Sequence, residues 1–157
     1  MIRLSRITDY GIVLMAHLAE CAEGSPHNAR EVAARTRLPL PVVSKVLKAL
    51  ARAGLLVSHR GAKGGYGLAR PPASITVPEM IAALEGPIAL TECAQHPGAC
   101  SQEPRCHVRE PWQRISRVVQ GALSRITLAD LVSPPRSNIV PLASLGVDTR
   151  NLDTSAS

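Results

Sequence analysis

Apolar residues recur at helical spacing through the first 50 residues and predict three helices. The first stripe favours an amphipathic helix from about Ser5 to Cys21. Asn28 and Glu31 are spaced as a capping box and predict a short helix over 29–36. A third helix should begin near Pro41, which is tolerated in a first helical turn, and should stop at Gly54. The buried stripe expected for this helix is Val43, Val46, Leu47 and Leu50.

A hairpin is expected directly after the third helix. Residues 55–59 alternate as a strand does, 60–67 form a glycine-rich loop, and 67–70 can return as a second strand before Pro71 and Pro72. Three short helices followed by a glycine-tipped hairpin predict a winged helix-turn-helix domain over residues 1–72.

The second half of the chain alternates between ordered and irregular patterns. Thr76 and Glu79 form another capping-box pair and predict a short connecting helix within 73–86. Residues 87–109 show no period and are expected to form a cysteine-containing loop. Residues 133–157 are rich in Ser, Pro, Asn and Thr and are expected to form a disordered tail.

A long helix is expected over 110–132, with apolar positions in steps of three and four residues. We favour a seam between two subunits over packing on the chain's own core, because a small domain precedes the helix. The residues expected in this dimer seam are Trp112, Ile115, Val119, Ala122 and Ile126. The predicted fold class is therefore mainly α with a small β-hairpin wing: a winged helix-turn-helix domain plus a long C-terminal dimerisation helix.

Charge is distributed unevenly and points to a polyanionic partner. Residues 1–70 contain 11 Lys and Arg against 4 Asp and Glu, whereas residues 71–157 contain 7 against 8. This placement favours double-stranded DNA as the partner of the first half. The candidate DNA-binding residues are Ser44, Lys45, Lys48 and Arg52 on the third helix, and Arg60, Lys63, Gly64, Gly65 and Tyr66 in the wing.

Several other classes are disfavoured by what the sequence lacks. The glycine-rich stretch is not a nucleotide loop, since Gly67 leads to Leu68 and two prolines rather than to a Ser or Thr opening a helix. No hydrolase, zinc-protease or dinucleotide motif is present, so we expect neither an enzyme nor a small-molecule substrate. No run of 18 apolar residues exists and no signal-peptide pattern is complete. We therefore expect a cytoplasmic protein without a membrane partner.

Three cysteines in the irregular segment suggest metal or redox chemistry. Cys93, Cys100 and Cys106 are separated by six and five residues. Clustered thiolates are soft ligands that suit iron–sulfur clusters, zinc or copper, although the lack of a C-x2-C pair disfavours a zinc ribbon. Unligated thiols remain an alternative. Cys21 lies among apolar residues and is expected to be a small core residue.

Several motifs together resemble a known family. They are Thr8-Asp9-Tyr10-Gly11, Val43-Ser44-Lys45-Val46-Leu47, Gly54-Leu55-Leu56, the stretch from Arg60 to Tyr66, and the cysteine triplet before a long helix. Over about residues 1–132 the chain resembles the Rrf-two (Rrf2) family of winged-helix regulators of the IscR and NsrR type. Its opening most resembles the branch that regulates the SUF iron–sulfur assembly operon.

The resemblance implies a homodimer with crossing C-terminal helices and an iron–sulfur cluster, [2Fe–2S] or [4Fe–4S], on the three loop cysteines. IscR-type loops have a His three residues after the last Cys, but Arg109 occupies that position here. NsrR-type proteins use an Asp on the first helix of the partner subunit, and Asp9 is the matching residue. We expect Asp9 to be the fourth ligand, and His107 and His96 are the less favoured candidates.

The function implied by this resemblance is regulation of transcription in response to iron–sulfur cluster status or redox stress, with SUF genes as targets. The alternative is a thiol- or zinc-based redox regulator without a cluster.

Overall fold

A computed structural model describes residues 4–21, 26–61, 64–96, 98 and 100–133. The fold is mainly helical with one two-stranded antiparallel hairpin, as predicted. The elements in chain order are α1 (Arg6–Glu20), α2 (Ala29–Thr36), α3 (Leu40–Arg52), β1 (Leu56–His59), β2 (Gly65–Leu68), the 3-10 helix η1 (Pro72–Ser74), α4 (Val77–Glu85), α5 (Glu92–Gln95), the 3-10 helix η2 (Glu103–Arg105), α6 (Arg109–Leu123) and α7 (Leu128–Val132).

Side-chain caps start α1 and α2, and a glycine follows the end of α3. The Ser5 hydroxyl accepts the Thr8 backbone N–H at the start of α1, and the Asn28 side chain accepts the Glu31 N–H at 2.9 Å at the start of α2. At the end of α3, Gly54 adopts φ +76° while the next N–H bonds back to Leu50 at 3.0 Å. This is the glycine-terminated helix end that the sequence predicted.

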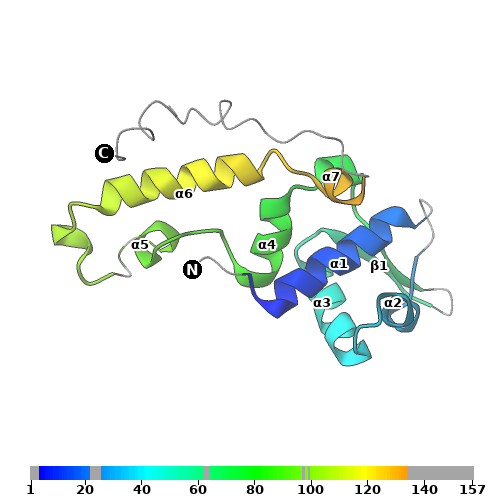
Figure 1. Cartoon of the computed structure of the whole chain (residues 1–157). Helices are drawn as coiled ribbons and strands as arrows, with labels where there is room; N and C mark the ends of the chain where they lie inside the picture. The colour runs from blue at the N-terminus through cyan, green and yellow to red at the C-terminus, as the bar shows by residue number, and fades with distance from the viewer. Residues whose placement is uncertain (1–3, 22–25, 62–63, 97, 99, 134–157) are drawn as a thin grey trace, which may run out of the picture.

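The core lies where α1, α3, α4 and α7 meet. Gly11 lets α1 and α4 approach closely, because a Cβ there would lie 2.2 Å from Leu84 Cδ1. Figure 1 shows these helices and the hairpin gathered on one side, with α6 extending away from them. Fully buried apolar side chains come from each part of this cluster: Leu14, Met15, Val32, Val43, Val46, Leu47, Leu50, Ile75, Met80 and Leu128.

The wing hairpin pairs Leu56 with Leu68 and His59 with Gly65. Its second strand starts two residues earlier than predicted. The reason is a third segment: the backbone of His27 exchanges two hydrogen bonds with Tyr66, at 3.0 and 2.8 Å. This pairing places the glycine-rich stretch in a strand, although its composition is typical of a loop.

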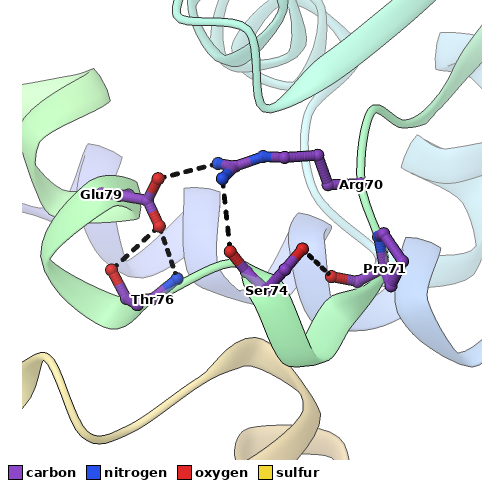
Figure 2. Close-up of polar contacts among 5 residues, drawn as sticks. All are labelled: Arg70, Pro71, Ser74, Thr76 and Glu79. Atoms are coloured by element: carbon purple, nitrogen blue, oxygen red, sulfur yellow. Dashed lines mark hydrogen bonds and ion pairs between the residues drawn. The ribbon is translucent and has the colours of Figure 1, made fainter.

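A polar network joins the wing to α4, as Figure 2 shows. Arg70 forms an ion pair with Glu79 at 2.8 Å and also donates to the Ser74 carbonyl. The other carboxylate oxygen of Glu79 accepts from the backbone and hydroxyl of Thr76, at 2.8 and 2.9 Å. The capping box expected at Thr76 is therefore present, and it also anchors the end of the wing.

The prediction of a single helix over 110–132 is wrong, because the helical conformation is interrupted between α6 and α7. Thr127 and Asp130 form a capping box that starts a new helix. On either side of Thr127, the Ile126 carbonyl accepts from Val77 N at 3.0 Å, and Leu128 N donates to the Ile75 carbonyl at 2.8 Å. These bonds hold the segment against the N-terminal core.

Two expectations change with this break. Ile126 packs against the core of its own chain and does not extend the apolar face of α6. The core also does not stop at residue 72, because Ile75, Met80 and Leu128 are fully buried in it. Of the predicted tail, residues 134–157 lie outside the described residues.

Short helices also interrupt the loop expected over 87–109: α5 and η2. No helix in the described part of the chain is long and apolar enough to cross a membrane.

Candidate nucleic-acid interface and cysteine loop

Helix α3 presents a cationic face opposite its buried one. Lys45, Lys48 and Arg52 are exposed, and Ser44 is half-buried. The four apolar residues predicted for the other face are all fully buried. Because α2 precedes α3 through a short turn at Arg37, these elements form a helix-turn-helix with α3 as the reading helix.

A shallow hollow separates α3 from the wing. It is lined by Lys48 and Arg52 of α3 and by Ser58 and Tyr66 of the two strands. Tyr66 is half-buried and also packs against the core. The hollow therefore combines two cations with two hydroxyls, which are groups that bind phosphate oxygens.

The wing tip is a tight turn built on glycines. Gly61 has φ +107°, and its carbonyl accepts from Gly64 N at 2.9 Å. A Cβ at Gly64 would lie 2.3 Å from the His59 carbonyl oxygen. Arg60 is exposed beside this turn, while Lys63 lies outside the described residues.

Gly65 has a packing role that the sequence did not reveal. A Cβ at this position would lie 2.5 Å from the carbonyl carbon and oxygen of His27. Its expected contact with DNA stays a prediction.

The three loop cysteines are free thiols at three places around the loop. Cys93 is buried in α5, and its sulfur lies 3.3 Å from the Thr91 hydroxyl. Cys100 and Cys106 are half-buried on either side of η2. Within the described residues, no three His, Cys, Asp or Glu side chains are arranged to hold a metal ion. The donor set suits an iron–sulfur cluster chemically, but this conformation does not gather it.

An ion pair that the sequence analysis missed organises the loop. Glu103, with only 8% of its side chain exposed, lies 2.7 Å from Arg109 Nη2. Its other oxygen accepts from Gly98 N at 2.6 Å. Arg109 Nε is buried and has no hydrogen-bond partner among the residues that the structure describes. The residue at the IscR-type histidine position is therefore held in a carboxylate pair, and no local sequence pattern signals it.

The candidates for a fourth ligand are all exposed. Asp9 lies on the first turn of α1, and His96 and His107 lie in the cysteine loop. The structure does not bring any of them together with the cysteines as a metal-binding group.

The residue before Asp9 takes part in a contact between α1 and α4 that was also missed. Glu85, the last residue of α4, accepts from Ser5 N at 2.6 Å and from the buried Thr8 hydroxyl. These hydrogen bonds hold the pKa of Glu85 below its usual value. The contact ties the start of α1 to the segment that leads into the cysteine loop.

Helix α6 has one apolar and one polar face, and the apolar face is open. Trp112, Ile115 and Val118 are 41%, 44% and 54% exposed. Two polar side chains of α6 bond to the segment before α5: Ser116 accepts from Leu90 N at 3.4 Å, and Gln120 donates to the Ile88 carbonyl. Val119 and Ala122, also expected in the seam, are partly buried. Val118 was missed because the alternating steps of three and four residues lead from Ile115 to Val119.

A helix-turn-helix with an outward cationic face, followed by a glycine-tipped hairpin, defines a winged-helix DNA-binding protein. The sequence matches the Rrf2 family, described as "Iron-dependent Transcriptional regulator", over residues 4–134. The chain belongs to this family and is a DNA-binding transcriptional regulator, not an enzyme.

Two curated relatives illustrate the range of the family. The chain is 36% identical to the regulator CymR of Bacillus subtilis over 124 residues, covering 79% of this chain and 85% of CymR. It is 30% identical to IscR of Escherichia coli over 131 residues, covering 83% of this chain and 80% of IscR.

Solved structures agree with this assignment. The structure of CymR, the global cysteine regulator of B. subtilis, superposes with a TM-score of 0.67 at 32% identity, covering 87% of this chain and all of that one. The structure of T. potens IscR superposes with a TM-score of 0.61 at 30% identity, covering 83% of this chain and 86% of that one.

Proposed function

We propose that the protein is a homodimeric regulator whose cysteine loop reports iron–sulfur cluster status or redox stress to the DNA-binding half. The observation that supports this best is the position of the three thiols. They lie on the segment that joins α4, which packs on α1, to α6, whose apolar face is exposed. A change in this segment acts on both the reading domain and the dimer contact.

Cys93, Cys100 and Cys106 would hold the cluster, and Asp9 of the partner subunit is the proposed fourth ligand, ahead of His107 and His96. A cluster of either nuclearity supplies a centre that is sensitive to oxidation and to iron supply. The ion pair between Glu103 and Arg109 joins the segments before and after Cys106.

The contact of Glu85 with α1 is the proposed route to the DNA-binding half. It fixes the first turn of α1, which contains Asp9, to the end of α4. A ligand role for Asp9 would therefore act directly on an element of the reading domain, as a switch with two states requires.

On DNA, each dimer should read a near-palindrome with half-sites whole helical turns apart, about 34 Å each. Ser44, Lys45 and Lys48 would face the base edges. The backbone phosphates would be contacted by Arg52, Arg60, Lys63, Gly64, Gly65 and Tyr66.

Iron–sulfur assembly genes of the SUF type are the proposed targets. The support is the resemblance of the opening motifs and the 30% identity with IscR.

A second candidate is a thiol- or zinc-based regulator without a cluster. It is favoured by the separation of the thiols in this conformation and by the 36% identity with CymR, the global cysteine regulator of B. subtilis.

An anaerobic absorption spectrum with iron and sulfide counted per chain separates the two candidates. A brown protein with matching iron and sulfide supports the cluster. A colourless protein that also fails anaerobic reconstitution rejects it and leaves the second candidate, which zinc analysis then tests.

The variant Asp9→Ala tests the fourth ligand. We expect the variant to lose its cluster faster than the wild type in air, because one of four ligands is removed. Glu20→Ala, at an exposed acid near the other end of α1, is the matched control. A variant that keeps its cluster and binds DNA normally would exclude this role for Asp9.

A further inference from the structure

A histidine and a cysteine contact each other at the C-terminal end of α1, away from the cysteine loop. The sulfur of Cys21 lies 3.8 Å from His17 Nε2, and the Cys21 backbone N–H also bonds to the His17 carbonyl at 3.2 Å. Both bonds hold the thiol in a fixed position against the imidazole. Cys21 is partly exposed, so the sequence-based expectation of a core residue does not describe it fully.

Cys21 lines a cavity of about 350 Å³ between α1 and the base of the wing. Cys21 and His27 line it on one side, and Val57, Gly67 and Leu68 of the wing line it on the other. Its volume lies within the range of about 300–1,000 Å³ found for small-molecule sites.

A second histidine lies beside the pair. His27 Nε2 is buried and makes no hydrogen bond within the described residues, while Nδ1 of the same ring lies 3.6 Å from Glu31. The rings of His17 and His27 are 6.4 Å apart, so the thiol and this nitrogen belong to one cluster.

We propose that Cys21 is a site of thiol–disulfide exchange with a low-molecular-weight disulfide, and that the resulting adduct occupies the cavity at the base of the wing. His17 accepts the thiol proton as the Cys21 sulfur attacks one sulfur of the small disulfide. A new S–S bond forms, the bond within the small disulfide breaks, and the leaving thiolate takes up the proton.

The surroundings of His17 keep its imidazole available as a base. Burial, followed by the positive charge of Arg35 and the neighbouring His27, lowers the pKa of His17, while Glu20 and Glu31 act in the opposite direction. The neutral ring is thus available as a base at neutral pH.

An adduct in this cavity would act on the wing without involving Cys93, Cys100 or Cys106. The backbone of His27 is bonded to β2, and Gly65 presses against it. A group that fills the space between α1 and the strands would contact both the wing and the His27 segment, and would therefore influence the position of the wing relative to α1.

The test treats the full-length protein with glutathione disulfide under anaerobic conditions and maps each cysteine by peptide mass spectrometry. We expect Cys21 to gain one glutathione and the modified protein to lose DNA affinity. Cys21→Ser should keep its DNA affinity under the same treatment. Because each cysteine is mapped separately, the result does not depend on the presence of a cluster. An unmodified Cys21, or equal loss of DNA binding in Cys21→Ser, overturns the proposal.

His17→Gln tests the base. The variant should react at Cys21 about 10²-fold more slowly near pH 7, the low end of what a positioned general base contributes. The difference should disappear as the pH falls through the pKa of His17, because a protonated ring accepts no proton. His59→Gln, in the same cavity, should leave the rate unchanged. Equal rates for His17→Gln and the wild type across this pH range would overturn the role of His17.

Discussion

At the scale of single residues, two glycines of the same wing strand differ in what surrounds them. A Cβ at Gly65 would lie 2.5 Å from the His27 backbone, whereas a Cβ at Gly67 meets only Val57 Cγ2 at 4.0 Å. Since neither has a positive φ, the difference between them is one of space and not of backbone conformation.

Gly65→Ala should therefore destabilise the protein by about 1–3 kcal/mol, the usual cost of overpacking against a backbone that cannot move freely. Gly67→Ala is the matched control and should change the free energy of unfolding by about 0.5 kcal/mol or less. Denaturant unfolding of both variants measures this. Equal values for the two would show that the wing moves away from His27 at little cost.

Residues of the DNA interface and the cysteine loop could be predicted only where side-chain type and helical spacing are enough to identify them. The three loop cysteines and the outward cations of α3 could be identified in this way. Glu85 and Glu103 could not, because their partners are set by tertiary structure. Glu85 bonds to Ser5 and Thr8, which are 80 and 77 positions away in the sequence. Glu103 pairs with Arg109 across the irregular segment around Cys106.

At the scale of elements, helix boundaries were predictable where caps are local. Helix α2 has the predicted bounds because Asn28 and Glu31 determine its start within four residues. The second strand and the end of α6 were misplaced because distant backbone segments pair there. His27 pairs with β2, and the segment around Thr127 pairs with residues 75–77.

The proposed phosphate contact of Arg52, at the end of α3, should appear in the salt dependence of DNA binding. Arg52→Ala is expected to weaken binding and to lower the slope of log K against log salt concentration by about 1, the value for one phosphate contact. Titrations of an operator duplex and an unrelated duplex at several salt concentrations measure this. Arg117→Ala, at an exposed cation on α6, is the control. An unchanged slope and affinity for Arg52→Ala would remove this residue from the interface.

The contacts of α4 with the wing and with α1 should make stability depend on pH. The pKa of Glu79 is lowered by the Thr76 backbone N–H and by Arg70, and the pKa of Glu85 by Ser5 and Thr8. A carboxylate with a lowered folded-state pKa stabilises the fold above its unfolded pKa, about 4.3 for Glu, and this contribution is lost as the pH falls through the folded value.

The double variant Glu79→Gln and Glu85→Gln should accordingly be less stable than the wild type at pH 7, and the difference should shrink below about pH 4. Urea unfolding from pH 7 to pH 3 tests this. A difference that stays constant with pH would show that the two carboxylates stabilise the fold by their shape and not by their charge.

At the scale of the whole molecule, the exposed apolar face of α6 is the proposed contact between subunits. Ile115→Glu should raise the dimer dissociation constant at least about 30-fold, corresponding to about 2 kcal/mol at a central interface residue. Sedimentation equilibrium measures this. Arg114→Glu, on the polar exposed side of the same helix, should leave the dimer intact. A dimer of unchanged affinity in Ile115→Glu would place the contact elsewhere.

The return of α7 to the N-terminal core determines when the reading domain can finish folding during synthesis. Leu128 is fully buried in that core, and its backbone bonds to Ile75, although more than 50 residues separate the two. A nascent chain that has emerged only as far as the wing lacks this side chain and its hydrogen bonds. Since proteins are made from the N-terminus onward, the DNA-reading half completes its core only after the cysteine loop and α6 have left the ribosome.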